Sequence, residues 1–269
     1  TYNRQFNGYV APDTIKVPRL TTPPEKFHGR TLFVKEHQKI AVGFLTNKGA
    51  GILAHDVGSG KTMSGIFAIN EAMARGWAKK PLIVVPNQVY GKWIGELREL
   101  LPGVRINELK NLGTKVAVPE IKDGTVTIMT YEGLSNLGLW PENQVRITNE
   151  LSDALLEPGQ KTERQKAIEA QKGEAMAGRA ARGVETYLED LGIDHITVDE
   201  IHNFKNIFTG AKIQTEEDGG KKTNEFAAVR GSSSNRGVKL YYLTQHILNQ
   251  NNRRNVFGLS ATPFTNNPL

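Results

Sequence analysis

Short apolar runs alternate with longer amphipathic stretches along most of the chain. The runs are three to six residues long and rich in Val, Ile and Leu, which is typical of strands buried on both faces of a sheet. The longer stretches have the apolar spacing of helices. Alternation of the two predicts an α/β fold, a mainly parallel sheet with helices on both faces. The expected strands are 51–54, 81–86, 104–109, 125–129, 196–198 and 256–259, and the expected helices are 32–45, 63–74 and 90–101.

Three segments depart from this alternation. Residues 1–30 are rich in Pro, Thr and Asn and predict an extended lead-in to a single domain over residues 31–269. Residues 143–190 are Ala-rich and charged, which predicts a helical insertion, favoured as a solvated spacer over a dedicated binding arm. Residues 209–235 combine Gly, Ser, Lys and acidic residues and predict a mobile loop whose length hints at a function.

The composition of the 269-residue chain narrows the classes of function. Cysteine is absent, which excludes disulfides, thiol nucleophiles and cysteine-ligated zinc and fits a reducing compartment. No apolar run approaches the roughly 18 residues that a membrane span needs, so we expect no membrane partner. The net charge of +6 is compatible with a polyanionic partner such as nucleic acid, and equally with a basic surface that has no partner.

The segment Gly58–Thr62 reads Gly-Ser-Gly-Lys-Thr between an expected strand and an expected helix. Glycines let backbone N–H groups approach phosphate oxygens, and the start of the following helix adds the positive end of its dipole. Lys61 is suited to reach the β- and γ-phosphates, and the Thr62 hydroxyl to ligate Mg²⁺. His55 occupies the first glycine position of the usual phosphate-loop pattern. The segment predicts a nucleotide site, and a chance Gly-rich turn is the alternative.

Two further polar groups follow expected strands. Asp199 and Glu200 come directly after residues 196–198, where Asp199 would hold Mg²⁺ through water and Glu200 would polarise an attacking water. An isolated Asp-Glu pair is usually a solvated turn, but after a phosphate loop in the same sheet it indicates a Walker B site. Ser260 and Thr262 follow the last expected strand, and their hydroxyls could hydrogen-bond the acidic pair and so register the nucleotide state.

These three segments, in this order, resemble motifs I, II and III of superfamily 2 helicases and translocases. Residues 199–206, Asp-Glu-Ile-His-Asn-Phe-Lys-Asn, are similar to the motif II of the Snf-type, chromatin-remodeller-like branch, with Ile201 in place of Ala. Residues 260–266 resemble its motif III. The resemblance spans about residues 32–269 and implies a RecA-like ATP-binding lobe. The insertion is also similar to those of very large phage or mobile-element proteins that join such a motor to a DNA methyltransferase, some of them linked to antirestriction.

The resemblance also implies a role for each matching position. Gln38 would read the adenine, Lys61, Asp199 and Glu200 would carry catalysis, and Thr62 and Asp199 would serve Mg²⁺. Motif III would couple the site to the rest of the motor through Ser260 and Thr262. The phosphates of ATP would be held by Gly58, Ser59, Gly60, Lys61 and Thr62, and nucleic acid would run along Pro86, Asn87, Trp93, Thr130 and Tyr131. For Trp93 the alternative is a place in the core, since a tryptophan on an amphipathic helix usually packs there.

The function that follows from the resemblance is an ATPase lobe of a helicase or double-stranded DNA translocase, which couples ATP hydrolysis to movement on DNA. Such motors close ATP between two RecA-like lobes, so we expect a second lobe, in the same or a partner chain, and poor hydrolysis by this chain alone. A docking module for nucleic acid or protein, with an idle ATPase site, is the alternative. The expected place is the cytoplasm of a bacterial or phage-infected cell, or a virion.

Overall fold

The structure is a computed structural model that describes residues 19–110, 112, 120–155, 186–204 and 234–262. The loop expected at 209–235 lies almost wholly outside these residues, and so do residues 156–185 of the expected insertion. Within the described residues, no helix combines the length and the apolar character that crossing a membrane requires.

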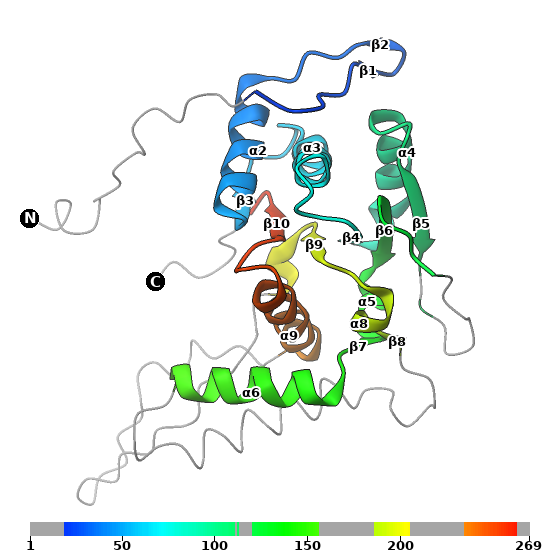
Figure 1. Ribbon diagram of the computed structural model, residues 1–269. Helices are drawn as coiled ribbons and strands as arrows, with labels where there is room; N and C mark the ends of the chain where they lie inside the picture. Colours follow the sequence, from blue (N-terminus) through cyan, green and yellow to red (C-terminus); the bar gives the residue numbers. More distant parts are fainter. Residues whose placement is uncertain (1–18, 111, 113–119, 156–185, 205–233, 263–269) are drawn as a thin grey trace, which may run out of the picture.

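A six-stranded parallel sheet forms the centre of the molecule (Figure 1). The six expected strands are all present, with ends that differ by one residue from those expected, so the predicted fold class is confirmed. In spatial order they are β3 (Ala50–Ala54), β10 (Val256–Ser260), β9 (His195–Val198), β4 (Pro81–Val85), β6 (Thr125–Thr130) and β5 (Arg105–Leu109).

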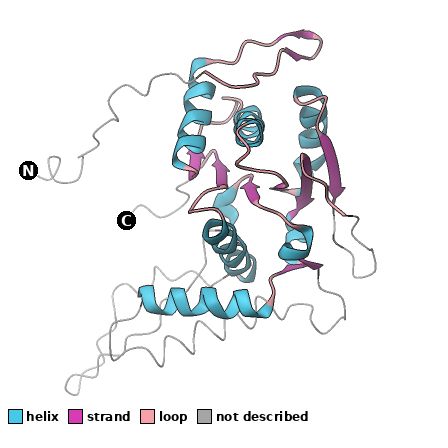
Figure 2. Ribbon diagram, viewed as in Figure 1, coloured by secondary structure: helices cyan, strands magenta, loops and turns pink. Residues whose placement is uncertain are grey.

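Helices cover both faces of the sheet (Figure 2). Successive residues of a strand point to opposite faces, and in β4 Leu82 and Val84 join one apolar cluster while Ile83 and Val85 join the other. Burial on both faces is why the central strands are apolar throughout. The cluster that includes Ile83 and Val85 packs under α2 (Glu36–Lys48), α3 (Lys61–Ala74) and α4 (Tyr90–Leu100). The cluster that includes Leu82 and Val84 packs under α5 (Tyr131–Ser135), α6 (Pro141–Leu155), α8 (Leu188–Leu191) and α9 (Asn235–Gln250).

The helix boundaries follow from local signals. The first helix begins at Glu36 rather than at residue 32, and it ends where Gly49 adopts a left-handed conformation (φ 81°). Helix α9, which the sequence reasoning missed, is capped by the Ser234 hydroxyl, which accepts a hydrogen bond from the Gly237 N–H. The short elements are β1 (Lys26–Phe27), β2 (Arg30–Thr31), η1 (Asn87–Val89), β7 (Leu137–Gly138), β8 (Thr186–Tyr187) and η3 (Ile201–Phe204).

The described end of the lead-in is attached to α3. The Thr21 N–H and hydroxyl both donate to the Glu71 carboxylate at 2.7 Å, and the Asn70 amide donates to the Thr22 carbonyl at 2.7 Å. Arg75, one turn after Glu71, donates to the same carboxylate at 2.7 Å. The described part of the lead-in is therefore held by hydrogen bonds to α3, the helix that follows the phosphate loop.

Candidate active site

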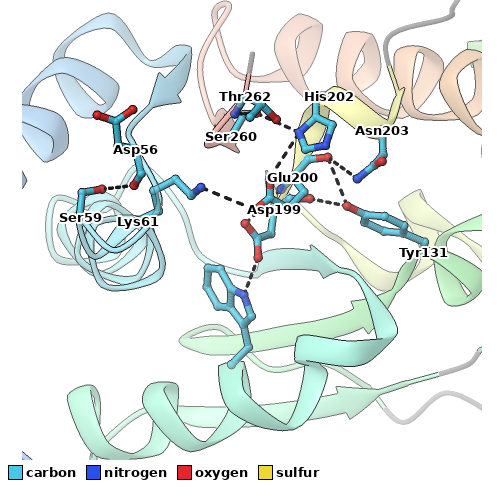
Figure 3. A network of polar contacts seen from close by, with 11 residues as sticks. Asp56, Ser59, Lys61, Tyr131, Asp199, Glu200, His202, Asn203, Ser260 and Thr262 are labelled. Atoms are coloured by element: carbon cyan, nitrogen blue, oxygen red, sulfur yellow. Dashed lines mark hydrogen bonds and ion pairs between the residues drawn. The ribbon is translucent and has the colours of Figure 1, made fainter. Parts of the chain in front are cut away.

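The carboxyl ends of β3, β10 and β9 lie at one edge of the sheet, because these three strands are parallel neighbours. Residues that follow them meet there, although they are up to two hundred residues apart in sequence (Figure 3). Lys61 begins α3 after the loop that follows β3, Glu200 follows β9, and Ser260 ends β10. The topology thus brings together all three motifs that the sequence singled out.

The phosphate loop requires glycine at Gly60. This residue has φ +83° as the N-cap of α3, and a Cβ there would lie 2.7 Å from Nε2 of Gln38. Gly58 has φ +82° and open space around it, so its need for glycine comes from the backbone alone. The Ser59 hydroxyl closes the turn by donating to the Asp56 carbonyl at 2.7 Å.

The first turn of α2 packs against this loop. Gln38 is buried, its Oε1 accepts the Lys35 N–H at 3.0 Å, and its amide nitrogen faces Gly60. His37 Nε2 lies 3.0 Å from the Ser59 carbonyl oxygen. Gln38 therefore lies beside the phosphate loop, and its contact with an adenine stays a prediction.

Asp199 is a buried carboxylate with a donor on each oxygen. The indole Nε1–H of Trp93 donates to Oδ2 at 2.8 Å, and the Glu200 N–H donates to Oδ1 at 3.0 Å. Burial, the largest influence, raises the pKa of Asp199 above its usual value, and the Trp93 hydrogen bond opposes that rise. Asp199 is also held through its backbone, because its N–H donates to the Val84 carbonyl at 2.9 Å.

Glu200 adopts an unusual backbone conformation, with φ +48°. A non-glycine residue there is strained by about 1–2 kcal/mol and is stable only where its surroundings fix it. The Tyr131 hydroxyl donates to the Asp199 carbonyl at 2.6 Å, and the Asn203 amide donates to the Glu200 carbonyl at 3.1 Å. The strained turn aims the Glu200 carboxylate at Lys61, with Oε1 3.6 Å from Nζ (Figure 3).

His202 joins motif II to motif III. Its Nδ1 lies 3.3 Å from Glu200 Oε2 and 3.0 Å from the Ser260 hydroxyl, which also accepts the Thr262 N–H at 3.1 Å (Figure 3). This corrects the expectation that the Ser260 and Thr262 hydroxyls bond the acidic pair directly. Ser260 reaches Glu200 through His202, and Thr262 contributes its backbone N–H. The reasoning from sequence gave His202 no role, although its place three residues after Asp199, within the motif, was the signal for one.

The five positions expected along nucleic acid divide into two groups. Asn87 is exposed and Pro86 is half-buried, and both lie just after β4. Trp93, Thr130 and Tyr131 are buried. Their side chains contribute to packing and internal hydrogen bonds, so the core alternative describes Trp93 in this structure. A contact of these three side chains with nucleic acid stays a prediction that their burial argues against.

Comparison with known proteins finds one family over most of the chain. The sequence profile of the family described as "Type III restriction enzyme, res subunit" matches residues 30–265. The "Uncharacterized ATP-dependent helicase YqhH" of Bacillus subtilis (strain 168) is 47% identical over 102 residues, which are 37% of this chain and 16% of that protein. The "DNA excision repair protein ERCC-6-like" of Danio rerio is 30% identical over 110 residues, 38% of this chain and 8% of that protein.

One solved structure that resembles the chain is the "Sulfolobus solfataricus SWI2/SNF2 ATPase core in complex with dsDNA". The match covers 84% of this chain and 31% of the solved chain, at 16% identity and a TM-score of 0.42. In all three proteins the matched region is less than a third of the relative's own length.

Proposed function

Because the chain belongs to the family of the Type III restriction enzyme res subunit, we propose that it is the ATP-binding lobe of a nucleic-acid-dependent ATPase motor. The motor is a helicase or a translocase on double-stranded DNA, and it couples ATP hydrolysis to movement. The observation that carries this proposal is the continuous line of contacts from Lys61 through Glu200 and His202 to Ser260. A phosphate-loop lysine, an acidic pair and a motif III serine in contact are the parts that such a site needs.

The residues at the edge of the sheet have separate tasks in this proposal. Lys61 and the backbone N–H groups of the phosphate loop hold the β- and γ-phosphates. The Glu200 carboxylate accepts the proton of the attacking water, and the imidazole of His202 holds it in place. Ser260 transmits the state of the site to the end of β10, because it bonds both His202 and the Thr262 N–H.

The oxygen ligands that the site offers suit Mg²⁺. They are the Thr62 hydroxyl and the Asp199 carboxylate, both oxygen ligands, with Glu200 next in sequence. Among the described residues, no three His, Asp or Glu side chains form a metal site by themselves. Magnesium does not need one, because it keeps waters and takes phosphate oxygens as its remaining ligands. When bound, the ion would neutralise charge on the β- and γ-phosphates.

DNA is the proposed partner, and a second RecA-like lobe the proposed complement. The net charge of +6 and the partial similarity to a DNA excision repair protein support DNA. A second lobe would close the exposed side of the phosphate loop and supply the arginine fingers. An origin in a phage or mobile element and a place in the cytoplasm or a virion also remain predictions from the sequence.

The test is the ATPase activity of the protein that carries this lobe, measured with and without duplex DNA. We expect DNA to stimulate hydrolysis, and Lys61→Ala to abolish the stimulated rate, because the γ-phosphate loses its positive partner. Lys48→Ala is the matched control, since Lys48 is an exposed lysine at the end of α2 and should leave the rate unchanged. Equal rates with and without DNA, in wild type and Lys61→Ala alike, would leave only the docking alternative.

A further inference from the structure

The indole of Trp93 is the least expected neighbour of the proposed magnesium site. Trp93 lies in the first turn of α4, with a fully buried side chain. Its single polar atom is a donor, and a buried indole N–H needs a partner. That partner is Oδ2 of Asp199, at 2.8 Å, 106 residues away in sequence.

The ring has little freedom to move away from this partner. It belongs to the apolar cluster between α3, α4 and the sheet. A Cβ at Gly65 would lie 3.3 Å from Cη2 of Trp93 and 2.7 Å from Cδ1 of Leu259, so α3 approaches the ring as closely as glycine allows. Gly65 is four residues after Lys61, and Leu259 directly precedes Ser260. The elements that carry the other motifs therefore enclose the indole.

Two donors together fix the plane of the Asp199 carboxylate. The χ2 angle of aspartate is intrinsically broad, so packing alone does not choose its orientation. The Glu200 N–H donates to Oδ1 and the Trp93 indole to Oδ2, both from within the protein. Each carboxylate oxygen has a second lone-pair position that these bonds leave open. A carboxylate held in this way can present the same oxygens to a cation each time one binds.

We propose that Trp93 is a positioning residue for Asp199, which it holds ready for Mg²⁺ when Mg–ATP binds. The inference rests on the proposed function, because it takes the Asp199 carboxylate as a ligand of the magnesium shell. Trp93 touches neither nucleotide nor metal in this role. A donor that orients a metal-binding carboxylate typically changes metal affinity by 10–100-fold when it is removed.

The experiment compares Trp93→Phe with wild type in Mg²⁺-dependent binding of a fluorescent ATP analogue. Phenylalanine keeps an apolar ring in the cluster and lacks the N–H. We expect the Mg²⁺ concentration for half-maximal binding to rise about tenfold, while binding of the analogue in EDTA stays the same. Trp140→Phe is the matched control, because Trp140 also donates its indole N–H to a carboxylate, that of Asp190 at 3.2 Å, away from the site.

The outcomes separate the two proposals. If wild type binds the analogue without any dependence on Mg²⁺, or not at all, the proposed function fails. If wild type depends on Mg²⁺ and Trp93→Phe has the same dependence, the positioning role fails alone. A loss of binding in EDTA as large as that in Mg²⁺ would make Trp93 a packing residue and also overturn the inference.

A measurement on wild type covers the case in which Trp93→Phe does not fold. The chain has three tryptophans, so its ¹⁵N spectrum has three indole signals, and Trp77→Phe and Trp140→Phe identify the Trp93 signal by elimination. Because the indole N–H donates to a carboxylate that would gain a cation, we expect this signal to shift when Mg²⁺ is added to the ATP-bound chain. An unchanged Trp93 signal at saturating Mg²⁺ would contradict the inference.

Discussion

Replacing Glu71 with Ala should detach the lead-in from α3. The Glu71 side chain is buried and accepts three hydrogen bonds, two from Thr21 and one from Arg75, each at 2.7 Å. In Glu71→Ala the Thr21 N–H and hydroxyl lose their acceptor, and the Arg75 guanidinium loses its ion pair.

The size of the effect follows from those three bonds. A hydrogen bond to a charged group contributes roughly 1.5–3 kcal/mol, whereas the partly exposed Arg75 pair contributes at most about 1 kcal/mol. The three bonds share one carboxylate, so their contributions do not simply add. We therefore expect Glu71→Ala to lower the free energy of unfolding by about 3 kcal/mol. Glu25→Ala, at an exposed glutamate of the same segment, should change it by less than about 0.5 kcal/mol.

The pH dependence provides a second, independent check. Burial alone would raise the pKa of Glu71, but the hydrogen bonds from Thr21 and Arg75 and the charge of Arg75 together lower it below 4.5. The stabilisation is therefore complete above about pH 4.5 and is lost as the pH falls through the lower, folded-state pKa. In urea unfolding, the difference in the free energy of unfolding between wild type and Glu71→Ala should be largest at neutral pH and should narrow as the pH falls below 4.5 and through the lowered pKa of Glu71. A difference in the free energy of unfolding below about 1 kcal/mol at pH 7, or a difference that does not narrow in acid, would refute this reasoning.

Two further substitutions test the geometry of the site. Gly60→Ala should lower the free energy of unfolding more than Gly58→Ala does. Both positions need a left-handed backbone, which costs alanine about 1–2 kcal/mol, but only the Cβ at residue 60 would meet Gln38. Equal losses of stability in thermal unfolding would show that the Gln38 side chain moves out of the way. Ser260→Ala should leave ATP affinity within about twofold of wild type and reduce DNA-stimulated hydrolysis about tenfold or more, because His202 loses one of its two partners. An unchanged rate at saturating ATP would show that Ser260 has no part in coupling.

The parts of the fold that could be predicted are those with a strong local signal. The central strands are apolar on both faces, so their positions follow from composition alone. Helix α9 was missed although Leu240, Leu243 and Ile247 line its buried side at helical spacing. Its first residue adjoins a Gly- and Ser-rich stretch, and Gly237, Tyr241, Tyr242 and Asn249 have low helix propensity. Ser234, as an N-cap, was the signal that could have revealed it.

The candidate site could be predicted as a set of residues and not as a set of contacts. Parallel strands end at a common edge, so Lys61, Glu200 and Ser260 could be expected there together. The path through His202 depends on how the turn after β9 aims two side chains, which no pattern in the sequence specifies. The bond from Trp93 to Asp199 similarly depends on the rotation of α4 about its axis, since the same helix position can face solvent or core.

The position of β10 has a consequence for the order in which the protein folds. Among the described strands, β3 pairs only with β10, although some two hundred residues separate them along the chain. During synthesis, the strand that precedes the phosphate loop has no partner in this sheet until Ser260 has been made. Contacts of such long range form slowly, because a large loop must close before they stabilise anything. We therefore expect ATP to bind only after β10 has joined the sheet. A nascent chain that stops before β10 leaves the edge of β9 unpaired, where it can misfold or aggregate.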